Sequence, residues 1–213
     1  MSVHELYAQN NEKYASAFDK GSLPMPPAKH VAIGRFNSFV IIQRLTMSPL
    51  VTCMDARVEP ASQLGINLGD AHVIRNAGGR AQDAIRNLII SQRLLGTREI
   101  ILFHHTDCGM LTFTTDQLKQ IVKDASPGDS TVASEVDKFD SFLDFKDLEG
   151  SVREDVEFLK SHPLILKDTP VTGWIYDVKS GKMICVRTSS DFQGHKCSLQ
   201  LSVWTIAGQT SHY

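Results

Sequence analysis

The 213-residue sequence has no uninterrupted apolar stretch of about 18 residues or more, the length that an α-helix needs to cross a bilayer. Residues 1–18 also lack an apolar run of the kind found in signal peptides. No charge of one sign dominates, because 22 basic and 24 acidic side chains leave a formal net charge of −2. These absences argue against a membrane or nucleic-acid partner, and they predict a cytoplasmic protein.

Cysteine is also scarce. The four cysteines are too few and too scattered for a disulfide framework, and no C-x-x-C redox motif is present. In a reducing compartment such cysteines serve as metal ligands, nucleophiles or small buried residues. The composition, 42% hydrophobic and 22% charged, is typical of a globular protein, and the length suits one domain over residues 1–213.

The pattern of apolar residues predicts an α/β fold with a mostly parallel central sheet flanked by helices. "AHVIRN" (71–76) and "REIILFHH" (98–105) are strand-like runs, and residues 80–96 between them have helical spacing and end at Gly96. The three segments form a β-α-β unit, whose strands are parallel. Helices are also expected over 114–125 and 151–162, with at most short helical turns in the connection 126–150.

Both ends of the chain depart from this alternation. Residues 1–20 resemble a polar helix that the Gly- and Pro-rich stretch 21–30 ends, so we expect an N-terminal helical arm over 1–30. Residues 169–188 contain two alternating runs separated by "KSGK", which predicts a hairpin that adds an antiparallel edge strand to the sheet.

Three residues with metal-binding side chains follow predicted strands. His105 and Cys108 have an H-x-x-C spacing after the strand 98–105, and Cys53 ends the apolar run "LVTC". Parallel strands finish at the same sheet edge, so Cys53 should lie close to the other two. Two thiolates and one imidazole favour zinc, and three protein ligands leave a fourth position open, as in catalytic sites. If the strand alternates, His104 points to the opposite face, and we expect it to be a core residue or one that supports a ligand rather than a ligand itself.

Asp55 and Arg57 follow the cysteine in "CMDAR". Asp55 could accept a hydrogen bond from a metal-bound water, and Arg57 could hold the carboxylate in a bidentate pair and keep it ionised. A plain strand-end salt bridge is the alternative, and the neighbouring thiolate ligand favours the active-site role. Asp107 is expected to form the turn or cap a helix.

With "VIRNAGG" (73–79) and "HHTDCGM" (104–110), the "CMDAR" segment resembles the β-class carbonic anhydrase family, whose pattern is C-x-D-x-R followed by H-x-x-C. The resemblance implies one zinc ion per chain, held by Cys53, His105 and Cys108, with Asp55 and Arg57 as the active-site dyad. It further implies attack of zinc-bound hydroxide on CO2 to give bicarbonate, and a homodimer or higher homo-oligomer in which the helical arm embraces a neighbouring subunit.

Two other functions stay open. Members similar to this small form hydrolyse carbonyl sulfide to CO2 and hydrogen sulfide at the same kind of site, and the ligand set does not separate the two substrates. A non-catalytic zinc module, in which Asp55 closes the coordination shell as a fourth ligand, is a third possibility.

Two segments depart from the family pattern. Residues 34–50 separate "KHVAI" from "VTCMDAR", two pieces that are effectively continuous in the family and would together form one buried strand. We expect an inserted loop here, with the alternative that "FVIIQRL" forms a strand of its own or covers the pocket. The tail 191–213 is also atypical.

Overall fold

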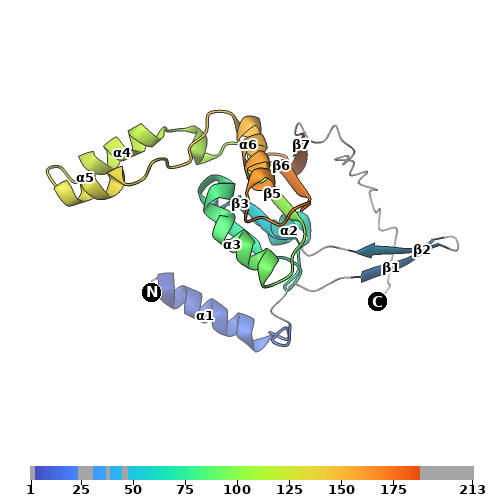
Figure 1. The fold of residues 1–213 in the computed structure, drawn as a ribbon. Helices are drawn as coiled ribbons and strands as arrows, with labels where there is room; N and C mark the ends of the chain where they lie inside the picture. Colours follow the sequence, from blue (N-terminus) through green and yellow to red (C-terminus); the bar gives the residue numbers. More distant parts are fainter. Residues whose placement is uncertain (1–2, 24–30, 37–38, 45–47, 188–213) are drawn as a thin grey trace.

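A five-stranded sheet lies at the centre of the computed structural model, which describes residues 3–23, 31–36, 39–44 and 48–187 (Figure 1). The spatial order is β4-β3-β5-β6-β7. The first four strands in this order are parallel and the last pair is antiparallel. The bounds are β3 (Leu50–Cys53), β4 (Val73–Asn76), β5 (Ile100–His105), β6 (Val171–Asp177) and β7 (Lys182–Val186). This arrangement confirms the predicted sheet and its antiparallel edge strand.

Helices α3 (Ala81–Arg93) and α6 (Leu148–Ser161) cover one face of the sheet. Their apolar residues, including Leu88 and Val156, form one buried cluster with Val51 and Leu102 of the sheet. Residues adjacent to these in the strands point to the other face, where Leu50 and Phe103 pack against residues in and after the short helix α2 (Pro60–Leu64). The alternation of side chains along β3 and β5 therefore gives the sheet two apolar faces.

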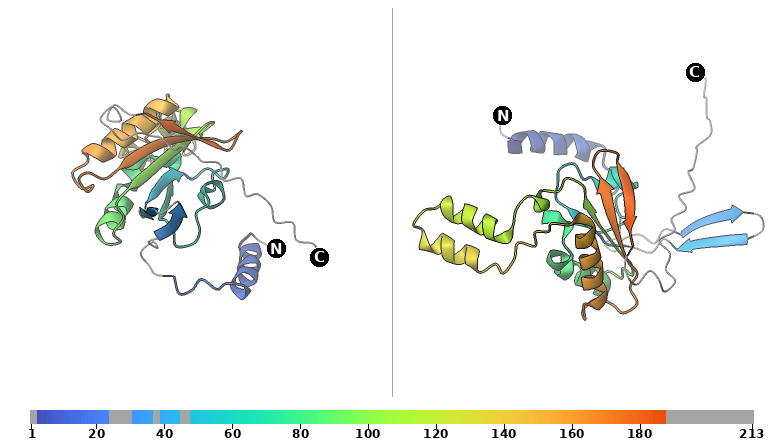
Figure 2. Two further views of the ribbon diagram at one scale, coloured as in Figure 1. Left: turned by 90° about the vertical axis from the view of Figure 1, so that its right-hand side faces the viewer. Right: turned by 90° about the horizontal axis from the view of Figure 1, so that it is seen from above.

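Helices α4 (Thr115–Asp124) and α5 (Ser130–Asp137) form a helical hairpin that extends away from the sheet (Figures 1 and 2). The sequence predicted α4 but only short turns in 126–150, and α5 with its eight residues corrects this. Asp129 accepts hydrogen bonds from the backbone N–H groups of Thr131 and Val132, so the same polar "SPGDS" stretch that ends one helix caps the next.

Helix α1 (Val3–Ser16) confirms the predicted N-terminal helix and lies apart from the sheet (Figures 1 and 2). Residues 24–30 of the expected arm are outside the described residues. Within the described part of the chain, no helix combines the length and the apolar character that crossing a membrane requires.

Strands β1 (Val31–Phe36) and β2 (Phe39–Arg44) pair antiparallel in a sheet of their own, which projects from the five-stranded sheet (Figure 2). Residues 39–44 therefore form a strand, as the alternative expectation for "FVIIQRL" had it. The hairpin also includes residues 31–33, which the sequence placed in line with β3. That 34–50 is an insertion stays a prediction, and the tail 191–213 lies outside the described residues.

Candidate metal centre

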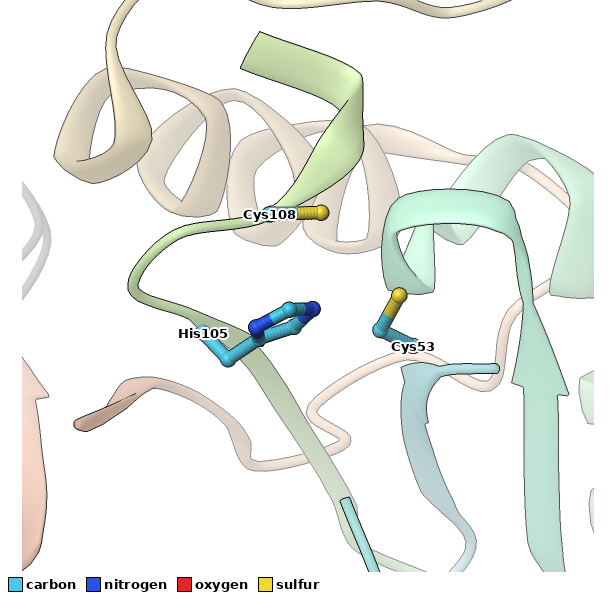
Figure 3. A group of neighbouring side chains, drawn as sticks. All are labelled: Cys53, His105 and Cys108. Atoms are coloured by element: carbon cyan, nitrogen blue, oxygen red, sulfur yellow. The ribbon is translucent and has the colours of Figure 1, made fainter. Parts of the chain in front are cut away.

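Cys53, His105 and Cys108 converge at the carboxyl edge of the sheet, where their side chains point toward a common space (Figure 3). Cys53 ends β3, His105 ends β5, and Cys108 immediately precedes the 3-10 helix η2 (Gly109–Leu111). Their ligand atoms lie within 4.8 Å of one another, and all three residues are buried. Two sulfur ligands of a tetrahedral zinc ion are roughly 3.8 Å apart, so a small closure of these side chains would suffice to bind one ion.

The loop between β4 and α3 packs against the backbone at Cys53. Gly78 and Gly79 have φ angles of 75° and 72°, a region that disfavours residues with a Cβ. A Cβ on Gly79 would lie only 2.9 Å from the carbonyl carbon of Thr52, so the loop backbone packs directly on the end of β3. From this position the N–H of Gly78 donates a hydrogen bond to Cys53, as the N–H of Asp55 also does.

The ring of His105 is oriented for metal binding through Nε2. Its Nδ1 lies 2.9 Å from the carbonyl oxygen of Thr106, which can only accept, so Nδ1 carries the hydrogen and donates this bond. Nε2 is buried and has no hydrogen-bond partner of normal geometry among the described residues. A buried ring nitrogen without a partner, facing two cysteine sulfurs, fits a metal ion, and the backbone carbonyl fixes the required tautomer.

Hydrogen bonding couples the two thiols in the metal-free site. The contact with Cys108 stabilises the thiolate of Cys53 and lowers the Cys53 pKa to about 4, against the opposing effect of burial. The same contact, together with burial, raises the pKa of Cys108, which keeps its proton. Burial acts to lower the pKa of His105, but the nearby Cys53 thiolate, the Thr106 carbonyl and the charge of Asp55 outweigh it and raise that pKa. Metal binding would therefore displace protons from this group.

Asp55 lies next to these ligands and is held by Arg57. Arg57 donates from Nε to Oδ1 at 3.0 Å and from Nη2 to Oδ2 at 2.8 Å, and its backbone N–H also donates to Oδ1. These hydrogen bonds hold the pKa of the Asp55 carboxyl well below its usual range. Oδ2 is 3.8 Å from Nε2 of His105, so a charged carboxylate oxygen borders the space that the three ligands face.

Asp107 occupies a place that the sequence did not predict. It forms a turn, as expected, with φ at 56°, but its side chain caps no helix and instead accepts from Nη1 of Arg57 at 2.7 Å. Its carbonyl oxygen accepts from Nη2 of the same arginine at 2.9 Å. Arg57 thus bridges Asp55 and Asp107, which belong to the two segments that carry the candidate ligands.

Sequence reasoning also missed Arg75, on the edge strand β4. Its guanidinium donates to the carbonyl oxygens of Cys53 and Asp55 at 3.1 and 2.7 Å. The register of the parallel strands, which the sequence does not give, places Arg75 opposite Thr52 and next to the end of β3. Arg75 fixes the path of the chain from Cys53 to Asp55.

His104 points away from this space, as strand alternation predicted. It is fully buried, with Nδ1 2.8 Å from Oγ of Ser151 and Nε2 3.2 Å from Oδ2 of Asp155. The same carboxylate oxygen accepts from the N–H of Ala81 at the start of α3. His104 is therefore a core residue that links β5 to the two helices on that face.

The fold and this group of residues define a class: an α/β protein with a buried Cys₂His centre at the carboxyl edge of a parallel sheet and an Asp–Arg pair beside it. The family model described as carbonic anhydrase matches residues 49–183. The chain belongs to the β-carbonic anhydrase family and is a carbonic anhydrase-like enzyme.

Individual relatives agree with the family. The chain is 45% identical to β-carbonic anhydrase 1 of Mycobacterium bovis over 184 residues, which is 86% of this chain and 97% of that protein. It is 38% identical to a carbon disulfide hydrolase of an Acidianus species over 151 residues, or 63% of this chain and 74% of the relative. The solved structure of a carbonic anhydrase from Glaciozyma antarctica is similar with a TM-score of 0.74 and 46% identity, covering 88% of this chain and all of that one.

Proposed function

We propose that this protein catalyses the reversible hydration of CO2 to bicarbonate at one zinc ion per chain, bound by Cys53, His105 and Cys108. One observation carries the proposal: the three buried soft or borderline ligand atoms of Cys53, His105 and Cys108 converge, Nε2 of His105 has no hydrogen-bond partner of normal geometry among the described residues, and an ionised carboxylate lies beside them. The 45% identity to β-carbonic anhydrase 1 of Mycobacterium bovis, over 97% of that protein, supports the same reaction. When bound, zinc supplies a Lewis acid that makes water a usable nucleophile near neutral pH.

In this proposal Asp55 orients the nucleophilic water and accepts its hydrogen bond. The carboxylate stays charged because Arg57 lowers its pKa, and the bidentate contact fixes the direction in which its oxygens point. Oδ1 accepts two hydrogen bonds from Arg57 and Oδ2 accepts one, so Oδ2 keeps a lone pair that can accept from the water. A water that can donate only to Asp55 has one favourable orientation. This lowers the entropic cost of reaching the geometry for attack on CO2.

Replacement of Asp55 by Asn tests this role. The amide keeps the shape of the side chain but loses the charge that pairs with Arg57, so we expect full zinc content and a CO2 hydration rate lower by about two orders of magnitude or more. The rate is measured by stopped flow with a pH indicator, next to metal analysis of the same sample. Asp137→Asn, on the remote helix α5, is the matched control for loss of one carboxylate charge. A wild-type rate in the Asp55 variant would reject the proposed role.

A second candidate is hydrolysis of a sulfur analogue, either carbonyl sulfide or carbon disulfide. The observation that favours it is the 38% identity to a carbon disulfide hydrolase over 151 residues. Both substrates have a linear, electrophilic carbon that the same nucleophile could attack. Comparison of kcat/KM for CO2, carbonyl sulfide and carbon disulfide on one zinc-loaded preparation separates the candidates.

We further propose a homodimer as the minimal assembly. Helix α1 lies apart from the sheet (Figure 1). It exposes several large apolar side chains, which a second subunit could cover. They are Val3, Leu6, Tyr7 and Tyr14. The oligomer and the cytoplasmic location stay predictions, and sedimentation analysis of the purified chain tests the former.

A further inference from the structure

The two segments that carry the candidate ligands separate just before the ligands begin. Backbone pairing between the parallel strands β3 and β5 ends at Thr52 and Phe103. Cys53 is instead paired with β4 on its outer side, opposite Asn76, and His105 is paired with β6, opposite Tyr176. Each ligand segment is therefore paired only with the strand on the side away from the other segment. The candidate ligands face the unpaired space between the two segments, where an ion could bind.

Arg57 and Asp107 connect these segments across the gap. Arg57 follows Cys53 by four positions, Asp107 precedes Cys108, and the two are joined by Nη1 to Oδ2 at 2.7 Å and Nη2 to the carbonyl oxygen at 2.9 Å. We name this pair of contacts the Arg57–Asp107 strap. The same guanidinium also holds Asp55, so one rigid planar group sets the positions of both segments.

We propose that Asp107 is a positioning residue, which, through Arg57, fixes the separation of the Cys53 segment from the His105–Cys108 turn before a metal ion binds. The proposal rests on the proposed function because it requires a metal at this site. The left-handed backbone of Asp107 supports this role. With φ at 56°, Asp107 turns the chain between His105 and Cys108, so that both ligands can face Cys53 (Figure 3).

A simple surface salt bridge is the competing explanation. The Asp107 side chain is 72% exposed, and exposed ion pairs contribute little to stability. Under that explanation, loss of the carboxylate would leave metal affinity unchanged. Under the positioning role, it would lower metal affinity with little effect on folding, because groups that orient metal ligands typically change affinity by about 10–100-fold.

The test measures the zinc dissociation constant of the full-length protein by competition with a chelator at fixed pH and ionic strength. Asp107→Asn keeps the side-chain shape and tolerates the left-handed backbone, whereas Asp107→Gly accepts that backbone and removes the side chain. We expect each variant to weaken zinc binding by about tenfold or more. The control is Asp137→Asn, which removes an exposed carboxylate paired with Lys123 at 2.8 Å and should bind zinc like the wild type.

A double-mutant cycle shows whether Asp107 acts through the arginine. In an Arg57→Ala background, Asp107→Gly should change the zinc dissociation constant by less than about twofold, because the strap is already absent. A backbone-flexibility effect of glycine would persist in that background and would overturn the proposal, as would wild-type affinity of Asp107→Gly alone. Zinc-free wild-type protein would overturn the proposed function and the strap with it, whereas tight wild-type binding with unchanged variants would overturn the strap alone.

Discussion

Replacement of Gly79 by alanine is expected to damage both the fold and the metal site, because the loop backbone lies directly against the end of β3. A Cβ at this position would lie 2.9 Å from the carbonyl carbon and 3.1 Å from the Cα of Thr52, and 3.0 Å from the backbone nitrogen of Cys53. All three neighbours are backbone atoms of a fully buried strand, so no side chain can rotate away. Either the loop or the strand must move.

The magnitude has two parts. A left-handed φ costs an alanine about 1–2 kcal/mol, and forced overpacking in a rigid core costs about 1–3 kcal/mol more. Gly128 provides the matched control, since its φ is 79° but no atom lies within 4 Å of the position that a Cβ would occupy there. Gly128→Ala should therefore lose only the first part, about 1–2 kcal/mol, and Gly79→Ala about 2–5 kcal/mol.

Urea denaturation of the metal-free variants measures both losses, provided that the slopes match the wild type. Zinc affinity is measured next, and only Gly79→Ala should lose it, because the displaced atoms include the backbone nitrogen of a proposed ligand. Equal stability loss in the two variants, with unchanged zinc affinity, would refute the steric reasoning.

The site and the strand that leads to it give three further predictions. Alanine at any one of the three proposed ligands, Cys53, His105 or Cys108, should abolish stoichiometric zinc retention in metal analysis, and full occupancy in such a variant would count against that ligand. The hydration rate should rise between about pH 6 and 9 along one ionisation, that of the nucleophilic water, because the lowered pKa of Asp55 keeps this carboxylate charged throughout; a steady fall with fold and zinc intact would contradict this. Deletion of residues 34–50 should preserve zinc binding and activity, since the join places Ile33 where the buried Leu50 now lies, and an inactive or zinc-free product would show that the segment belongs to the fold.

The position of the proposed ligands followed from topology. Once residues 71–105 were assigned to a β-α-β unit, the rule that parallel strands end at one edge brought Cys53 and His105 together without further information. Alternation within β5 then separated His104 from His105, and the structure gives these two side chains opposite surroundings. Strand alternation and helical spacing repeat with a fixed number of residues, so both can be recognised directly in the sequence.

Contacts between turns were not accessible in the same way. The bond from Arg57 to Asp107 depends on a left-handed residue and on the direction in which two loops leave neighbouring strands. No repeating pattern in the sequence predicts the left-handed residue or the direction of the loops. Aspartate also favours turns for several unrelated reasons, so Asp107 alone did not indicate this contact. Arg75 was missed for a similar reason, because an arginine on an edge strand is indistinguishable from an ordinary surface residue until the strand register is known.

The charges around the site explain why both arginines lie where they do. Two thiolates, Asp55 and Asp107 would place four negative charges close together, and Arg57 and Arg75 offset two of them. A divalent cation would offset the remaining two, so the complete group would be neutral, and at its centre the three ligands are buried, where unbalanced charge is costly. Without the ion, the contact with the Cys53 thiolate and burial raise the pKa of Cys108, so a proton on Cys108 offsets one of these charges. The arginines therefore leave a deficit of charge that matches one Zn²⁺ ion.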